Sequence, residues 1–264
     1  GKDLEVRQCT FTAEPTAVAA VDCSKPENKE KPRCLAGADM TNLRYRDAVD
    51  IFTRADQASG DEQRKLYERA ASELVKAVND EPKHPQAPLA LEKAAIALER
   101  TSRFESAARL YQRIVDEVGP LKGATPQEQA QLDSILGNAY FRLGYNANRF
   151  FDFDRAVESY RVLADSERFT KSSAPSLVEA REGALINAAK ILESRQQYER
   201  AATYYKRAAD VLRDANERRA AAFRVAEMSF KLKQWAKAQR EMQDFIAKYK
   251  ADPAAGELLV EAYS

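Results

Sequence analysis

A five-residue stretch that occurs twice constrains this chain most, because repeated sequence implies repeated structure. Tyr67-Glu68-Arg69-Ala70-Ala71 recurs letter for letter at residues 198–202. Three further stretches, starting at Phe104, Phe153 and Trp235, follow the same template. In each, an aromatic residue is followed three positions later by alanine, and apolar residues stand four and seven positions after that alanine. These spacings place the template on one face of a helix.

A second amphipathic segment precedes each template where it can be traced. These segments are residues 89–100, 132–148, 177–194 and 218–231. Each repeat is therefore predicted to be a helical hairpin that buries its second face against its neighbours. Six prolines fall between the hairpins, where they can begin or end helices: Pro82, Pro85, Pro120, Pro126, Pro175 and Pro253. The predicted fold class is all-α, an α-solenoid of about five hairpins over residues 37–264.

The template resembles the tetratricopeptide repeat (TPR) family, which carries Leu-Gly and then Tyr on the first helix and small and aromatic positions on the second. The third repeat carries this pattern most fully, with Leu136, Gly137, Tyr140, Gly144 and Tyr145, and then Ala156 and Tyr160. The resemblance covers roughly residues 40–264. It implies TPR-like hairpins and leaves the ligand open.

The repeats are longer than those of the family. The small residues Ala70, Ala107, Ala156, Ala201 and Ala238 are separated by 37, 49, 45 and 37 positions, whereas the TPR period is about 34. In the third repeat this alignment requires an insertion of about two helical turns between Tyr145 and Ala156. Such irregular repeats are most similar in style to the scaffold proteins of bacterial cell envelopes.

Residues 1–36 do not follow the repeat and are predicted to be an extended arm with one short strand at residues 4–12. All three cysteines, Cys9, Cys23 and Cys34, lie in this arm. A zinc site would usually bring a Cys-x-x-Cys pair or nearby His. A disulfide is favoured, because it would stabilise an arm that has little hydrophobic core, and which two of the three cysteines pair stays open. Such a disulfide would indicate an oxidising compartment.

Composition excludes several function classes. Lys and Arg number 42 against 41 for Asp and Glu, so no bulk charge attracts nucleic acid or an anionic membrane. No apolar run is long enough to span a bilayer. The chain lacks a Gly-rich phosphate loop, and its one histidine, His84, stands between prolines in a linker. We therefore expect no enzyme, no cofactor, no metal and no small-molecule substrate.

Three sets of residues are candidates for partner binding. In TPR cochaperones, Lys, Asn and Arg on three first helices hold a peptide carboxylate, and the resemblance places Asn138, Asn187 and Arg224 at matching positions, with Arg219 beside a missing lysine. Phe150, Phe151 and Phe153 would lie in the inserted turns, either buried or displayed as a binding edge. Residues 200–250 carry 13 Lys and Arg against 6 Asp and Glu, so an acidic partner or nucleic acid is a further possibility.

The leading hypothesis is a non-catalytic protein–protein interaction scaffold of a bacterial cell-envelope machine, which binds a peptide segment or a helix of its partners. Outer-membrane assembly, division, secretion and gliding motility are the candidate machines. Its predicted location is periplasmic or outer-membrane associated. The alternatives are a cytosolic peptide-carboxylate receptor of cochaperone type in the cytoplasm and, less favoured, a nucleic-acid-binding helical repeat.

Overall fold

The structure is a computed structural model that describes residues 32–172 and 174–263, with side chains from residue 42 onward. Backbone contacts divide the chain into two units, residues 1–44 and 45–264. The hairpins lie in the second unit, and the first unit contributes the beginning of helix α1. Cys9, Cys23 and the predicted strand lie outside the described residues, as does the side chain of Cys34, so the disulfide stays a prediction.

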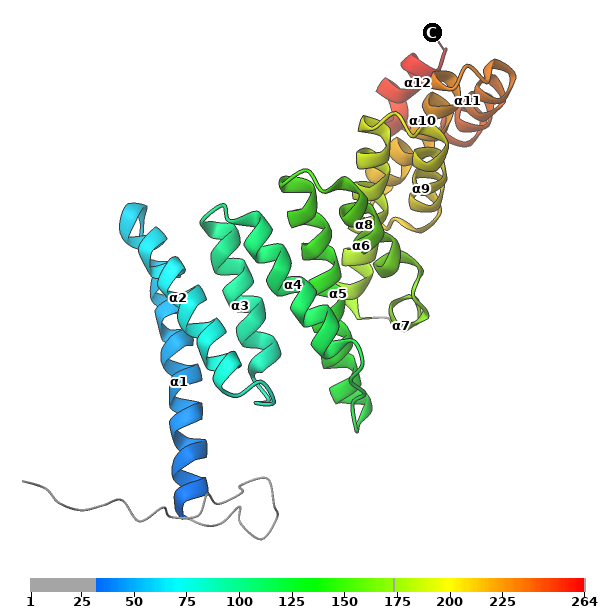
Figure 1. Cartoon of the computed structure of the whole chain (residues 1–264). Coiled ribbons are helices and arrows are strands. Elements are labelled where there is room, and N and C mark those ends of the chain that lie inside the picture. Colours follow the sequence, from blue (N-terminus) through cyan, green and yellow to red (C-terminus); the bar gives the residue numbers. More distant parts are fainter. Residues whose placement is uncertain (1–31, 173, 264) are drawn as a thin grey trace, which may run out of the picture. The chain divides into compact units, whose positions relative to one another are not determined.

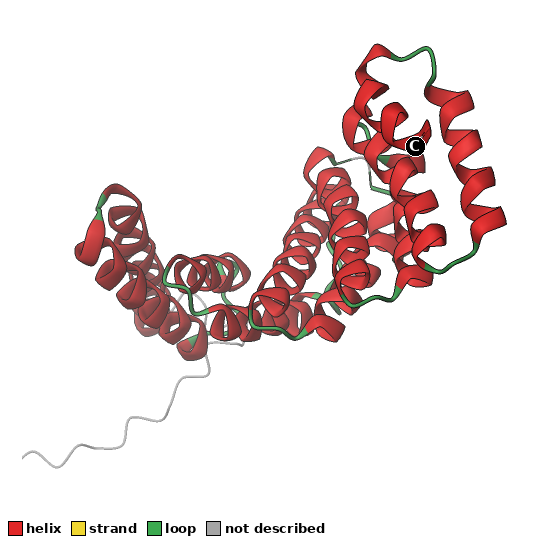
Figure 2. Ribbon diagram, turned by 90° about the horizontal axis from the view of Figure 1, so that it is seen from above, coloured by secondary structure: helices red, strands yellow, loops and turns green. Residues whose placement is uncertain are grey.

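The described residues form helices and no strand (Figure 2). The elements are α1 (Pro32–Gln57), α2 (Gly60–Asp80), α3 (Ala87–Arg100), α4 (Phe104–Val118), α5 (Pro126–Arg149), α6 (Phe153–Asp165), α7 (Glu167–Thr170), α8 (Pro175–Ser194), α9 (Tyr198–Val211), α10 (Ala215–Lys231), α11 (Trp235–Tyr249), a 3-10 turn (Pro253–Ala255) and α12 (Gly256–Tyr263). Pairing α1 with α2, α3 with α4, α5 with α6, α8 with α9 and α10 with α11 gives five hairpins (Figure 1). The predicted α-solenoid of TPR-like hairpins is confirmed. Helix α1 begins at Pro32, so the last five residues of the predicted arm are helical.

Four of the turns within hairpins share one backbone form. The middle residue of each has a positive φ, between 59° and 68°, and these residues are Ser102, Phe151, Gln196 and Lys233. The residue after it donates its N–H to the carbonyl five positions earlier, at 2.8 to 3.0 Å, which closes a Schellman motif. None of the four is glycine, so the usual sequence signal for this turn is missing.

The third hairpin corrects the predicted two-turn insertion. Its turn at residues 150–152 has the same form as the others, so nothing is inserted between Tyr145 and Ala156. The extra length lies in the first helix itself, because α5 spans 24 residues and α3 spans only 14. The error arose because a shift of seven residues is nearly two helical turns and keeps the same face.

The Leu-Gly pair that meets the second helix is Leu143-Gly144, seven residues after the predicted pair. A Cβ on Gly144 would lie 2.7 Å from Cε1 of Tyr160, so the ring packs directly against the glycine backbone. Gly137 serves a different contact, because a Cβ there would lie 2.2 Å from Cδ2 of Leu177 in α8. Both glycines let a neighbouring helix approach closely.

The first hairpin shows the same shift of seven residues. Tyr198 begins α9, but Tyr67 lies seven residues after Gly60, the first residue of α2. Tyr67 donates a hydrogen bond of 2.6 Å to Asp56 of α1, and its ring meets Phe52 edge to face at 5.6 Å. The identical stretches therefore pack on equivalent faces at different heights of their helices.

Gly144→Val should destabilise the fold, since its side chain would enter the space of the Tyr160 ring. Overpacking of this kind costs roughly 1–3 kcal/mol of the free energy of unfolding. Gly256→Ala is the matched control, because a Cβ there meets nothing within 4 Å. Urea unfolding followed by circular dichroism checks both variants. Equal stability of Gly144→Val and the natural chain would contradict this packing.

Candidate functional site

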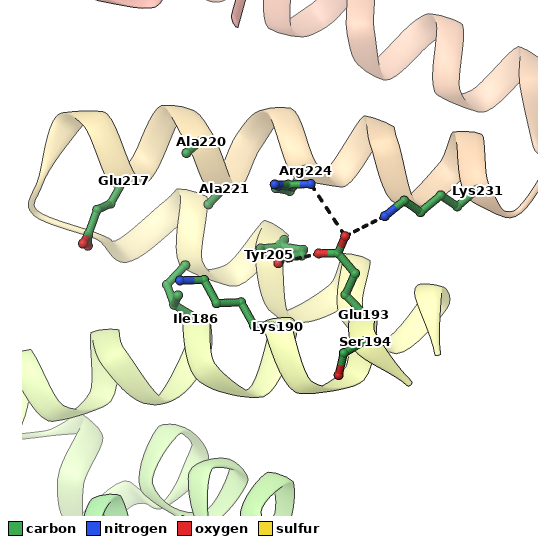
Figure 3. A pocket seen from close by; sticks show the side chains of 10 residues that line it. All are labelled: Ile186, Lys190, Glu193, Ser194, Tyr205, Glu217, Ala220, Ala221, Arg224 and Lys231. Carbon is green, nitrogen blue, oxygen red and sulfur yellow. Dashed lines mark hydrogen bonds and ion pairs between the residues drawn. The ribbon is translucent and has the colours of Figure 1, made fainter. Parts of the chain in front are cut away.

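A polar cluster joins the fourth and fifth hairpins. The Glu193 carboxylate, near the end of α8, accepts a hydrogen bond of 2.7 Å from the Tyr205 hydroxyl in α9. It also accepts one of 2.6 Å from Nζ of Lys231 in α10 and lies 3.6 Å from Nη1 of Arg224 in the same helix (Figure 3). One carboxylate thus ties the two helices of its own hairpin to the first helix of the next.

A related cluster lies between the second and third hairpins. Glu99 stands eight residues before Ala107, as Glu193 stands eight before Ala201. Its carboxylate lies 3.3 Å from Nη1 of Arg142 in α5 and also accepts from Asn146. Burial first, and the Glu99 charge second, raise the pKa of the neighbouring Tyr111. Sequence reasoning missed this cluster, although the equal offset of the two glutamates was visible.

The interface between the third and fourth hairpins carries a neutral version of the cluster. Asn148 takes the position of the glutamate, and Nδ2 of Asn187 donates a hydrogen bond of 3.3 Å to the Tyr160 hydroxyl. Asn187 and Arg224 occupy equivalent positions, fourteen residues before their alanines. Both predicted clamp residues therefore take part in contacts between hairpins.

A groove lies between α8 and α10 and has a volume of about 510 Å³. Its apolar lining comes from Ile186, Ala220, Ala221 and the ring of Tyr205 (Figure 3). Glu217 lies at one end, and the cluster around Glu193 lies at the other. From Glu217 to Lys231 the helix rises roughly 21 Å, the length of about six extended residues.

Basic side chains line the groove along its length. Arg224 and Lys231 contact Glu193 at one end. Lys190 lies between that end and Glu217, with its amine toward Ile186 (Figure 3), and it is exposed and makes no ion pair with any described residue. Burial alone raises the pKa of the Glu193 carboxyl, but the hydrogen bonds from Lys231 and Tyr205 outweigh it and hold that pKa below its ordinary value. Burial raises the pKa of Glu227, which pairs with Arg224 at 3.0 Å. The lining of the groove thus carries three basic side chains, Lys190, Arg224 and Lys231, against the two carboxylates of Glu193 and Glu217.

The predicted clamp residues do not converge on one site. Asn138 donates a hydrogen bond to Glu92 of α3, away from the groove. Arg219 is only 6% exposed, and its Nη1 donates a hydrogen bond of 2.7 Å to Asp252. With Leu143-Gly144 as the reference, the clamp position predicted for Asn138 belongs instead to Tyr145. Arg224 is the one member of the predicted set that lines the groove.

The three phenylalanines of the third hairpin lie in different surroundings. Phe150 is partly buried and packs against the core. Phe153 begins α6 and lies 5.3 Å below the guanidinium of Arg195. Phe151 is 78% exposed and contacts Phe153 edge to face at 6.1 Å. Of the three, Phe151 is the one that a partner could reach without displacing core packing.

The one histidine of the chain makes structural contacts. His84 stacks on Tyr45 with ring centroids 4.2 Å apart, and its Nδ1 accepts a hydrogen bond from the Gln86 backbone. No group of three or more His, Cys, Asp or Glu side chains in the described part of the chain could hold a metal ion. Within the same residues, no helix has the length and apolar character needed to cross a bilayer.

The sequence matches no protein-family profile and no curated protein. Among solved structures, a Podospora anserina protein of kinesin light chain type with TPR-like repeats is 16% identical over 78% of this chain and 94% of its own, with a TM-score of 0.49. BtubC from P. vanneervenii is 17% identical over 71% of this chain and 72% of its own, at 0.44. The TPR2AB domain of yeast Sti1, in its complex with pHSP90, is 14% identical over 86% and 98%, at 0.31. The TPR-like fold therefore rests on the repeat geometry of this chain.

Replacing Glu193 should weaken the interface of the fourth and fifth hairpins. Glu193→Gln removes the charge that Lys231 and Arg224 share, and we expect a loss on the order of 1–3 kcal/mol of the free energy of unfolding at neutral pH. The folded pKa of Glu193 is depressed, so its contribution is present above the unfolded pKa of about 4.3 and is lost as the pH falls through the folded value.

The measurement is urea unfolding of the natural chain and of Glu193→Gln between neutral and acidic pH. Glu68→Gln, on the exposed side of α2, is the control and should match the natural chain throughout. Two results would contradict an energetic role of the cluster. One is an equal free energy of unfolding for the natural chain and Glu193→Gln at neutral pH. The other is a difference between the two that persists at acidic pH.

Proposed function

We propose that this chain is a non-catalytic protein-interaction scaffold whose α8–α10 groove binds an extended peptide with a carboxylate at the Lys231 end. The observation that carries the proposal is an apolar groove whose lining has three basic side chains, Lys190, Arg224 and Lys231, against two carboxylates, Glu193 and Glu217. The apolar walls would bury side chains of the peptide, and the cations would receive its acidic group.

The hairpins support this function through rigidity. The ties at Glu193 and Tyr205 fix the spacing of α8 and α10 before any partner arrives. A preformed groove loses less conformational entropy on binding than a flexible segment does. Recognition by several rigid helices is a common way in which proteins hold peptide segments.

Blocking the groove should abolish peptide binding. Ala220 is exposed and lines the groove, so Ala220→Trp would fill the space between Ile186 and Tyr205. Ala247→Trp is the matched control, on an exposed position of α11. A random peptide library should yield peptides that the natural chain and Ala247→Trp bind alike and that Ala220→Trp binds at least about tenfold more weakly.

The binding proposal fails if no library peptide is retained, or if Ala220→Trp and Ala247→Trp bind the selected peptides equally. Thermal unfolding of both variants shows whether each remains folded. Lys190→Glu provides a second test that leaves the groove open and reverses one charge. It should weaken the peptides that carry a carboxylate and leave uncharged peptides unaffected.

The cellular setting that we propose is the bacterial envelope, in a machine of outer-membrane assembly, division, secretion or gliding motility. This setting rests on the clustering of the three cysteines within residues 9–34 and the absence of cysteine from residues 35–264. Free-thiol counting on the chain from its native compartment checks it. We expect one free thiol. Three free thiols would contradict the envelope setting and favour a cytosolic receptor of cochaperone type.

A further inference from the structure

Three hairpin turns carry the same cation–π contact. The aromatic residue that begins a second helix lies under a basic side chain from the next hairpin, in the pairs Phe104 with Arg149 at 4.8 Å, Phe153 with Arg195 at 5.3 Å and Tyr198 with Lys231 at 5.5 Å. An acidic residue follows each of these aromatics in the sequence, namely Glu105, Asp154 and Glu199. In each of these three hairpin turns, which we call corners, the aromatic ring and the acidic residue therefore favour a cation.

The fifth hairpin departs from this pattern at two positions. Trp235 begins α11, but Ala236 follows it where the other corners have an acid. Phe230 stands eight residues before Ala238, the position of Glu99 and Glu193 in their hairpins. Both acidic positions have thus become apolar. The α10–α11 corner therefore lacks the carboxylates that attract a cation at the other three corners.

In their place the corner presents two exposed rings. Phe230 is 61% exposed and Trp235 is 56% exposed, and the rings meet edge to face with centroids 5.0 Å apart. No other hairpin turn of the described chain has two exposed aromatic side chains in contact with each other, since Phe151 packs on the partly buried Phe153. Such a pair offers a large apolar contact at a small entropic cost, as binding hot spots do.

The sequence around the two rings is rich in basic residues. Residues 228–240 contain Lys231, Lys233, Lys237 and Arg240 and not one carboxylate. Lys233 and Arg240 make no ion pair with any described residue, whereas Lys231 bonds to Glu193 and Lys237 lies 3.9 Å from Glu241. Charge complementarity at this corner therefore favours an acidic occupant.

We propose that the α10–α11 corner, formed by Phe230, Trp235 and Lys233, is a second binding surface for an acidic protein segment that carries an aromatic or aliphatic anchor. The anchor packs on the two rings, and a flanking carboxylate meets Lys233. This surface is separate from the Ala220 groove, so a failure of peptide binding at the groove would leave this proposal unaffected.

A protein segment fits this corner better than the other anionic partners. Binding to a lipid surface uses a broad apolar face along a helix, and the corner offers two rings. Single-stranded nucleic acid requires a basic track with successive stacking positions, whereas the two rings here lie at 73° to each other. An acidic segment needs only one anchor and a few carboxylates.

The single tryptophan of the chain makes the corner directly observable, because excitation at the red edge of the absorption band selects Trp235 over the eleven tyrosines. Peptides selected from a random library by the full chain should include a class enriched in Asp and Glu around one apolar residue. These peptides should shift the Trp235 emission to shorter wavelength as the indole leaves water. Phe230→Ala, and separately Lys233→Glu, should weaken the binding of these peptides by about tenfold or more, and added salt should weaken their binding further.

Leu121→Ala and Lys83→Glu are the controls, since both residues are exposed and far from the corner in sequence, and they should bind as the natural chain does. Ala220→Trp should leave this class of peptide bound, which separates the corner from the groove. The proposal is overturned if no acidic class is selected, or if the Phe230 and charge-reversal variants bind that class normally. It is also overturned if phosphatidylglycerol vesicles or a single-stranded oligonucleotide shift the emission and acidic peptides do not.

Discussion

The contact between one carboxylate and the first helix of the next hairpin is the interaction on which the arrangement of the fourth and fifth hairpins depends. A helical hairpin cannot bury its second face alone, so each must stack on a neighbour. Glu193 fixes that stacking, because it accepts from Tyr205 in its own hairpin and from Lys231 in the next. Glu99 and Arg142 repeat the arrangement two hairpins earlier.

The contacts between hairpins also determine which side chains are available to contact a partner. Asn187 is engaged by Tyr160, and Arg219 is buried against Asp252, so neither extends freely from the helix surface. Arg224 shares Glu193 with Lys231 and keeps 47% of its side chain exposed. Because Arg224 and Lys231 both contact Glu193, the charged end of the groove is a direct consequence of the way the hairpins are joined.

The helical faces were predictable from the sequence, but the position along each helix was not. Two alignments, at Leu136-Gly137 and at Tyr67, were displaced by seven residues. Seven residues are nearly two turns, so apolar spacing identifies the buried face and is almost blind to such a shift. The turns would have resolved the register, but their positive-φ residues, such as Phe151 and Lys233, lack the glycine signal. The groove could not be predicted, since Glu193 and Lys231 lie far apart in the sequence.

The last hairpin is where the repeat changes its chemistry, and we place the recognition of partners there. Hydrogen exchange of the full chain, free and saturated with peptides that it selects from a random library, tests this claim most directly. We predict slower exchange in α8, α10 and the turn at residues 232–234, with α3, α4 and α5 unchanged. Protection confined to α3, α4 and α5, with no change in α10, would contradict it.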